Sequence, residues 1–518
     1  MRTAFFLTAP ILLPIVFGLL LGILRGRRQD SQPMPSKPGN GGRRCPWLVI
    51  LALALNVPLV LAAALNPGLR LIVIRLTDRL PILFISDGMG AFFCVLTAFV
   101  YLLAGTFSLE YMKHEENAGR FYMFFLFSLG MLNGIGLAGN LMTLYLFFEA
   151  LTLLSLPLVI HAMTKEAIAA TFKYLFYSMA GTSLALVGFF FVYNYGHTLE
   201  FGPGSALDMA SLVGHENAML TAILLAVIGF GAKAGMFPLH SWLPAAHPVA
   251  PAPASAILSG IITKAGAFAV IRFVFYLVGP DFLRGTWAQS AWMALALISI
   301  VMGSMLAYRE TMFKTRLAYS SISQVSYVLF GLSMLSADGM LGAMLHMAGH
   351  SLVKSALFLS AGAVAYRTQK TAVSELRGIG RQMPLTLGCF TLAAITLVGI
   401  PPTSGFISKW FLATGSLAGT GFFSWLGPVI LLLSALLTAG YLLPISISGF
   451  FPGSEANQDR EANLGHEMPL NRNAEPEKKE ANALITAPLV VLVVLAVLIG
   501  IYPGILISFI SKTIGAIF

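Results

Sequence analysis

The sequence predicts an all-α protein that crosses a membrane many times, and three observations support this fold class. Of the 518 residues, 57% are hydrophobic and only 10% are charged, whereas about 25% of the residues of an ordinary soluble protein are charged. The mean hydropathy is +0.81. Apolar runs of about 20 residues, each long enough to cross a ~30 Å hydrocarbon core, recur along nearly the whole chain. This composition excludes a soluble enzyme.

Charges, prolines and glycines bound the apolar runs and divide the chain into about fourteen expected transmembrane helices. The first run could be a signal peptide, but a basic stretch follows it instead of a small-residue cleavage site, so we expect a retained helix. Two hydrophilic inserts, 25–46 and 451–483, carry no catalytic pattern. In chain order the expected helices span residues 4–24, 47–65, 88–106, 121–138, 140–161, 167–194, 217–237, 251–278, 287–307, 317–334, 338–365, 385–416, 427–450 and 484–510.

Lysine and arginine alternate between the loops, which predicts the orientation. The loops after odd-numbered helices hold 20 of these residues, whereas the opposite loops and the two termini hold 6. By the positive-inside rule the first set is cytoplasmic and both termini lie outside, in what we expect to be a prokaryotic plasma membrane. The same bias accounts for the net charge of +10, so we expect no nucleic-acid partner.

The three cysteines are too scattered to build a site. Cys45, Cys94 and Cys389 form no CxxC or CxxH pair, which removes a disulfide framework, a zinc site and a cysteine-held iron–sulfur cluster. We therefore expect neither a metal nor a cofactor in this chain. If the chain serves an oxidoreductase, it does so as a subunit without a redox centre of its own.

Ionisable residues inside the expected spans are the main functional signal. A charge at bilayer depth costs ~2.5 to 3.5 kcal/mol on insertion scales, so such residues usually mark ion paths or counter-ions. Glu149 is the single acidic residue that we place deep in a span. Arg272 sits near an outer helix end, where we expect it to snorkel to the interface and to be structural. The basic residues within the spans are Lys173, Lys233, Lys264, Arg272, Lys354 and Lys409.

One span carries a polar stripe. His346, His350 and Lys354 repeat every four residues and therefore share one face of the expected helix. Such a stripe suits a proton relay. The alternative is a pair of histidines hydrogen-bonded within a packed bundle, whereas a haem or metal site lacks partner ligands elsewhere in the sequence. A glutamate and a lysine that approach and separate could switch the lysine between holding and releasing a proton.

Two spans combine glycine, proline and lysine. The motif GFGAKAGMFPLHSWLP contains Pro238, and LVGIPPTSGFISKW, five helices later, contains Pro401 and Pro402. Interrupted helices at corresponding positions of two halves are typical of inverted-repeat transporters. We therefore expect breaks in the seventh and twelfth helices. The expected units are the peripheral region 1–120, a first five-helix repeat 121–278, a second repeat 287–450, the cytoplasmic loop 451–483 and a last helix within 484–518.

Several long motifs resemble one family. The chain contains five such motifs, in this order: LYLFFEALTLLSLPLV, KAGMFPLHSWLPAAHPVAPAPASAILSGIITKAG, FKTRLAYSSISQVSYV, HMAGHSLVKSALFLSAG and GIPPTSGFISKW. Together they are similar to the antiporter-like subunits of respiratory complex I, of Mrp-type cation/proton antiporters and of membrane-bound energy-converting hydrogenases. The resemblance implies fourteen helices, two inverted repeats and a central hydrophilic axis that carries protons.

The resemblance also assigns roles by position. It implies that Glu149 and Lys233 form a pair, that Lys264 connects them to a relay, and that Lys409 is the terminal group. His346, His350 and Lys354 match the relay itself, and Lys173 matches a lysine frequent in the family. The segments Lys233-Ala-Gly-Met and HPVAPAP depart from the complex I pattern and look closer to the hydrogenase-associated branch.

Three functional hypotheses follow. The first is a proton-conducting subunit that other membrane subunits and a peripheral redox module drive. The second is a subunit of an Mrp-type Na⁺/H⁺ antiporter; because Na⁺ prefers oxygen ligands, a lysine-rich axis with one deep acid favours protons. The third, from a different class, is a membrane scaffold that conducts nothing, which leaves the cost of so many ionisable groups in lipid unexplained.

Overall fold

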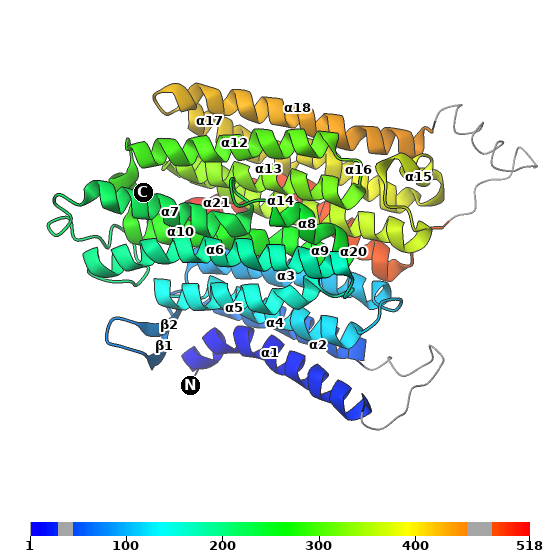
Figure 1. Cartoon of the computed structure of the whole chain (residues 1–518), viewed down its shortest axis with the longest axis horizontal. Coiled ribbons are helices and arrows are strands. Elements are labelled where there is room, and N and C mark those ends of the chain that lie inside the picture. The colour runs from blue at the N-terminus through cyan, green and yellow to red at the C-terminus, as the bar shows by residue number, and fades with distance from the viewer. Residues whose placement is uncertain (1, 30–44, 453–478) are drawn as a thin grey trace, which may run out of the picture.

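The computed structural model describes residues 2–29, 45–452 and 479–518, and most of them form long helices that run along one common direction (Figure 1). Within these residues, ten helices are long and apolar enough to cross a membrane. The chain is therefore a multi-pass membrane protein. Most of the basic insert 25–46 and of the hydrophilic insert 451–483 lies outside the described residues.

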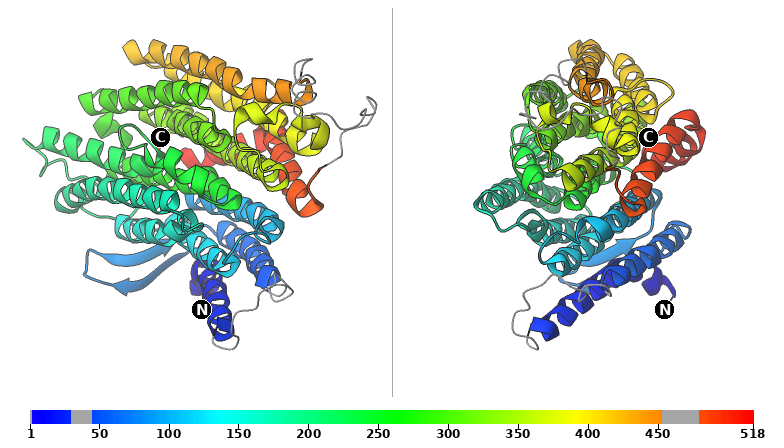
Figure 2. Two further views of the ribbon diagram at one scale, coloured as in Figure 1. Left: turned by 45° about the vertical axis from the view of Figure 1, so that its right-hand side comes forward. Right: turned by 90° about the vertical axis from the view of Figure 1, so that its right-hand side faces the viewer.

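The N-terminal region is not entirely helical. Helices α1 (Arg2–Gln29), α2 (Cys45–Ala64) and α3 (Gly88–Tyr111) match the first three expected spans. Between α2 and α3, however, strands β1 (Arg70–Arg75) and β2 (Pro81–Ile85) pair antiparallel in a hairpin at one end of the bundle (Figures 1 and 2). The all-α expectation is wrong here. The apolar runs RLIVIR and PILFI are rich in β-branched residues, which favour strands. They are too short to span a bilayer, so an analysis based on hydropathy assigns them to a loop.

Four helices follow α3, and polar caps begin two of them. They are α4 (Ala118–Gly136), α5 (Leu141–Val159), α6 (Lys165–Tyr195) and α7 (Glu216–Ala234). The side chains of Asn140 and Thr164 accept hydrogen bonds from backbone amides in the first turns of α5 and α6, which satisfies donors that a helix start leaves free.

The chain leaves the helical path after α7. Gly235 adopts a φ of +81°, which a glycine adopts without steric cost, and the amide of Met236 donates to Gly231 O at 2.9 Å. An irregular segment containing Pro238 follows, and the helical path resumes at α8 (Trp242–Val249). The interruption therefore lies two to eight residues beyond Lys233.

The next span is the most deeply buried one. It consists of α9 (Ala252–Ile257), the π-helical segment η1 (Leu258–Ile262), α10 (Thr263–Phe273) and a second π-helical segment η2 (Val274–Val278). Of its most apolar window, 94% is buried inside the protein. π-Helical turns occur frequently at functional sites, and η1 ends two residues before Lys264.

The second half of the chain repeats the pattern of long helices with one interruption. Gly399, with a φ of +92°, ends α16, and the stretch with Pro401 and Pro402 separates α16 from α17. The elements of this half are α11 (Pro280–Leu283), α12 (Trp287–Arg309), α13 (Phe313–Ser333), α14 (Ala337–Thr368), η3 (Val373–Leu376), α15 (Ile379–Gln382), α16 (Pro384–Val398), α17 (Ser404–Leu417) and α18 (Phe422–Phe450).

The last expected helix, 484–510, is two helices. Helix α20 (Ala483–Ile501) ends just before Pro503, and α21 (Gly504–Ile514) begins after it. A residue that precedes proline is disfavoured in the helical region, which accounts for the turn at Tyr502. The two helices lie against one flank of the bundle (Figure 2, red).

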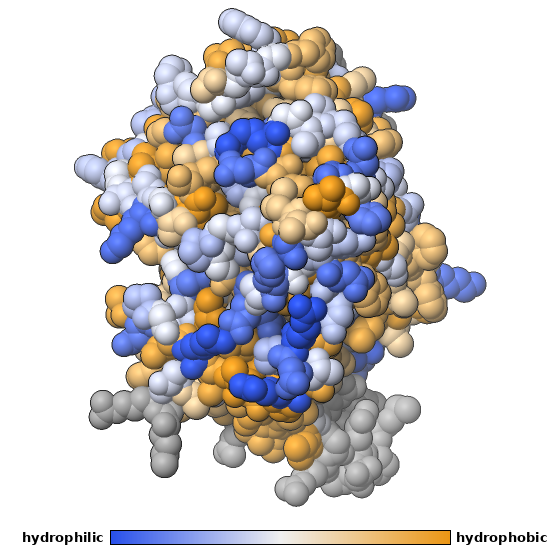
Figure 3. All heavy atoms as spheres, turned by 90° about the vertical axis from the view of Figure 1, so that its left-hand side faces the viewer, coloured by the Kyte–Doolittle hydropathy of each residue, from blue (hydrophilic) through white to orange (hydrophobic). Residues whose placement is uncertain are grey.

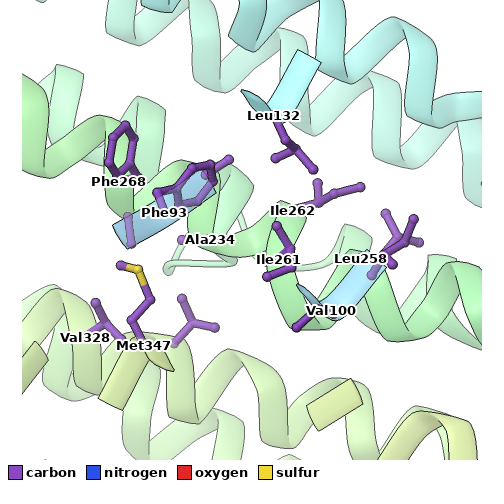
Figure 4. Close-up of a cluster of buried hydrophobic side chains, with 14 of the residues drawn as sticks. Phe93, Val100, Leu132, Ala234, Leu258, Ile261, Ile262, Phe268, Val328 and Met347 are labelled. Carbon is purple, nitrogen blue, oxygen red and sulfur yellow. The ribbon is translucent and has the colours of Figure 1, made fainter. Parts of the chain in front are cut away.

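Apolar side chains fill the space between the central helices. Phe93 of α3 stacks on Phe268 of α10 with ring centroids 4.5 Å apart, and Met347 of α14 lies on the other side of this cluster (Figure 4). Hydrophilic residues gather toward the middle of one end of the molecule, with apolar ones around them (Figure 3). Polar groups inside the bundle are therefore held in an apolar medium, where they need partners within the protein.

Candidate functional site: a buried line of basic side chains

The relay stripe predicted from the four-residue spacing lies on one face of α14, inside the bundle. The rings of His346 and His350 are parallel to within 12°, with centroids 5.6 Å apart. Both side chains are 3% exposed, and Lys354, one turn further, is fully buried. The Nε2 of His346 and both ring nitrogens of His350 have no hydrogen-bond partner among the described residues. These nitrogens are consequently open to a proton or a water molecule.

At one end of the stripe, side chains of α13 and α17 connect His346 to Lys409. The Nδ1 of His346 lies 2.9 Å from Ser408 Oγ, and the ring of Tyr327 stacks on the imidazole with centroids 5.2 Å apart. The Nζ of Lys409 lies 5.3 Å from the centre of the Tyr327 ring.

The interruption between α16 and α17 holds the amine of Lys409. This amine donates at 2.7 Å to both Leu397 O and Val398 O. These carbonyls belong to the last turn of α16, where helix carbonyls lack intrahelical partners and carry partial negative charge. The broken helix thus supplies a site for a cation without any carboxylate.

At the other end of the stripe, hydroxyl groups hold two fully buried lysines. The amine of Lys354 donates to Leu317 O at 3.0 Å and to the hydroxyl of Ser320, both on α13. The amine of Lys264 donates to the carbonyl of Ser259 in η1. The hydroxyls of Ser259 and Ser321 lie 2.7 Å apart and join η1 to α13.

Lys233 lies within the bundle, but its predicted partner does not contact it. Its amine donates to Thr152 Oγ1 at 2.6 Å and to Phe148 O at 3.4 Å, and it lies 4.5 Å from the centre of the Phe148 ring. Glu149 is only partly buried, and no ion pair joins it to Lys233 in the described part of the chain. Its charge still acts on Lys233. The pairing of the two stays a prediction.

Two further sequence-based expectations have different outcomes. Lys173 is an exposed residue of α6, and its predicted place in a proton path stays untested. The expectation that Arg272 snorkels to the interface is wrong. Arg272 is fully buried and makes a bidentate pair with Asp87, with N–O distances of 2.5 and 2.7 Å. Hydropathy indicates how deep a residue lies in the membrane, but not which residues surround it. It therefore could not show that Asp87, which caps the start of α3, lies beside this arginine.

The sequence analysis missed several polar residues along the line. His247 of α8 is fully buried, its ring stacks on Phe358 at 4.5 Å, and neither ring nitrogen has a partner among the described residues. Its sequence signal is its position in HSWLPAAHPVAP, beside a helix interruption. The serine-rich run of α13, which includes Ser320 and Ser321, looks on its own like ordinary small-residue packing.

A cavity adjoins the residues that follow this histidine. It has a volume of about 310 Å³, and Glu115, Lys314 and the stretch 248–251 line it. The amine of Lys314 donates to Ala250 O at 3.0 Å, three residues beyond His247. The cavity is large enough to hold water, and it reaches residues 248–251, which directly follow His247.

The sequence matches a described family over more than half of its length. Residues 138–438 match "NADH:quinone oxidoreductase/Mrp antiporter, TM", and residues 77–122 match "NADH-Ubiquinone oxidoreductase (complex I), chain 5 N-terminus". The first match includes every lysine and histidine of the buried line.

Two curated relatives show the same likeness. The chain is 32% identical to NADH-quinone oxidoreductase subunit N of Desulforudis audaxviator over 426 residues, which are 81% of each chain. It is 33% identical to Hydrogenase-4 component B of Escherichia coli over 338 residues, which are 63% of this chain and 49% of that protein. The chain thus spans about half the length of the second relative.

Solved structures share the fold. An archaeal membrane-bound sulfane sulfur reductase complex contains a chain with a TM-score of 0.81 at 22% identity, covering 100% of this chain and 97% of that one. The Mrp complex from Dietzia sp. contains one with a TM-score of 0.80 at 20% identity, covering 99% and 97%. With the sequence match, these likenesses show that the chain belongs to the NADH:quinone oxidoreductase/Mrp antiporter transmembrane family.

Proposed function

We propose that the chain is a proton-translocating subunit of a multisubunit membrane complex driven by redox chemistry on other chains. One observation carries this proposal: a buried line of basic groups runs from Lys264 and Lys354 through the two stacked histidines to Lys409. Each lysine donates to protein oxygens. Because burying cations is costly, a line of this kind is retained where it transports charge.

The proposed route follows the contacts of the line. Protons enter from the cytoplasm near Lys233 and leave outward beyond Lys409. A neutral imidazole accepts a proton at one ring nitrogen and donates from the other, so the open nitrogens of His350 suit transfer between His346 and Lys354. The same proposal includes fourteen transmembrane helices, two inverted repeats over 121–278 and 287–450, and termini that face outward.

The partners are proposed by analogy with the relatives. Both structural neighbours lie in multisubunit membrane complexes, so other membrane subunits are expected beside this chain. A peripheral module would carry the electron donor and acceptor, and the chain would need no cofactor of its own. Its departures from the complex I motifs favour a hydrogenase-like module.

His350→Met tests the relay. Without the imidazole, His346 and Lys354 are about two turns apart, ~11 Å along the axis, which is too far for direct proton transfer. Methionine fills similar space, and a packing role would tolerate it within ~1 to 2 kcal/mol. We expect proton translocation by reconstituted vesicles, normalised to assembled complex, to fall at least tenfold.

The matched control is His161→Met, because His161 is also buried but lies in the loop between α5 and α6. This variant should pump normally. If His350→Met pumps as well as the control, or if its loss only follows reduced assembly, the histidines are packing groups.

The Mrp-type alternative remains as a second candidate, because the structural likeness to the Mrp complex is close to that of the reductase complex. In vesicles free of any electron donor, an exchanger would release protons in response to a Na⁺ gradient. The redox-driven subunit would do so only when the complex turns over.

A further inference from the structure

An apolar groove on the outside of the bundle lies apart from the buried line. It has a volume of about 540 Å³ and runs between α12 and α18. Leu297, which is nearly buried, forms its floor, and the exposed side chains of Ile298 and Met305 form its rim. Its lining consists of Ala294, Leu297, Ile298, Val301, Met302, Met305, Leu306, Arg309, Phe423, Leu426 and Ile430.

The groove has a charged end. Arg309 is the one charged residue among its lining residues and lies at the last position of α12. Its side chain is exposed, and no hydrogen bond or ion pair joins its guanidinium to another residue of the described chain. Nearby Arg316, by contrast, donates to backbone oxygens of Glu310 and Tyr441. Arg309 is therefore the basic group of this region that remains open to an external anion.

The dimensions and surroundings fit one lipid chain. From Ala294 to Arg309 the helix rises about 22 Å, which is longer than the ~15 Å depth of one leaflet, so the groove has room for the full length of one acyl chain. Aromatic side chains bracket the same helix: Trp287 near its start is 47% exposed and Tyr308 near its end is 55% exposed. Tryptophan and tyrosine gather at the two membrane interfaces, so this face of the helix fits contact with lipid over its full length.

We propose that the groove binds one acyl chain of an anionic phospholipid whose phosphate group pairs with Arg309. Basic pockets between transmembrane helices at the cytoplasmic side take anionic headgroups, and the expected orientation places Arg309 on that side. The apolar walls supply affinity for any acyl chain, whereas the guanidinium supplies a preference for net negative charge. This site is independent of the proton route.

Photolabelling of the intact complex tests the proposal. The complex is placed in nanodiscs of dioleoylphosphatidylcholine with a trace of phosphatidylglycerol that carries a diazirine on one acyl chain, and labelled residues are mapped by mass spectrometry. We expect label on residues of the groove, such as Met302 and Ile430. Added dioleoylphosphatidylglycerol should displace it at about fivefold lower concentration than added dioleoylphosphatidylcholine, because one basic residue near the surface contributes ~1 kcal/mol.

Three variants sharpen the result. Arg309→Gln should remove the fivefold preference but keep the label. Arg381→Gln, which changes another exposed arginine away from the groove, should leave both unchanged. Val301→Trp, which fills the groove, should abolish the label with either lipid. Equal displacement by the two lipids in the unaltered complex, or an unchanged preference in Arg309→Gln, would overturn the proposal. So would absence of label where crosslinks show a neighbouring subunit covering the groove.

Discussion

At the scale of single residues, oxygen atoms of neighbouring helices determine what each buried lysine contacts. The amine of Lys233 lies against Thr152 and Phe148, whereas Glu149, one residue from Phe148, is only partly buried. Consecutive helical residues differ by ~100° around the axis. Sequence could therefore predict that Glu149 and Lys233 lie at similar depth, but not that a threonine occupies the place of the carboxylate.

Outside the spans, His161 gives a prediction about pH. Burial and the neighbouring charge of Arg120 lower the pKa of His161 to about 4, whereas an unfolded histidine has a pKa near 6.5. Because the folded pKa is the lower one, the unfolded chain binds more protons between these values, and stability falls as pH decreases from about 6.5 to about 4.

We expect His161→Gln to reduce this acid sensitivity. The measurement is the midpoint of thermal inactivation of the purified complex at pH 7 and at pH 5, compared between wild type and variant. His197→Gln is the control, because His197 is exposed. An equal loss on acidification in wild type and His161→Gln would contradict the assignment.

At the scale of elements, glycine and proline explain which features of the fold were predictable. The interruptions after Lys233 and around Pro401 lie within the motifs that predicted them, because a positive φ and a missing amide are local properties of glycine and proline. The hairpin between α2 and α3 and the turn at Pro503 were missed. Hydropathy records neither the pairing of two short strands nor the break that a proline introduces after a long apolar run.

Gly399→Ala tests the function of the second interruption. Alanine at a φ of +92° is strained by ~1 to 3 kcal/mol, and its Cβ would lie 3.0 Å from Lys409 Cδ and 3.4 Å from Lys409 Nζ. We expect the lysine to shift away from Leu397 O and Val398 O, and proton translocation per assembled complex to fall several-fold.

The control separates strain from displacement. Gly421 also has a positive φ, of +107°, but a Cβ there would meet nothing within 4 Å. Gly421→Ala should cost similar stability and leave proton translocation unchanged. Equal translocation by the two variants would show that the position of Lys409 is not critical.

At the scale of the whole molecule, the direction of the chain through the membrane is the main untested expectation. The 20 to 6 distribution of basic residues predicts that the loop after α3 is cytoplasmic and the loop before α12 is outside. Glu116 and Asp281 are exposed residues of these loops.

Single cysteines at these positions, Glu116→Cys and Asp281→Cys in a background without the native cysteines, should react with an impermeant maleimide from opposite sides of sealed vesicles. Reaction of both from the same side would mean that the number of crossings between them is even and that the assignment of spans is wrong.

The proposed proton route has a consequence for how many protons the buried line would hold at once. Its lysines and histidines face hydroxyls and carbonyls, and no carboxylate lies among the described partners of Lys264, Lys354 and Lys409. Two unit charges ~6 Å apart at an effective dielectric constant of about 20 repel each other by ~3 kcal/mol. If the line carries protons as proposed, a proton on one site disfavours a second one on its neighbour, and occupancy along the line would alternate. A proton that arrives at one end would then displace the next one, so that mutual repulsion would couple uptake to release.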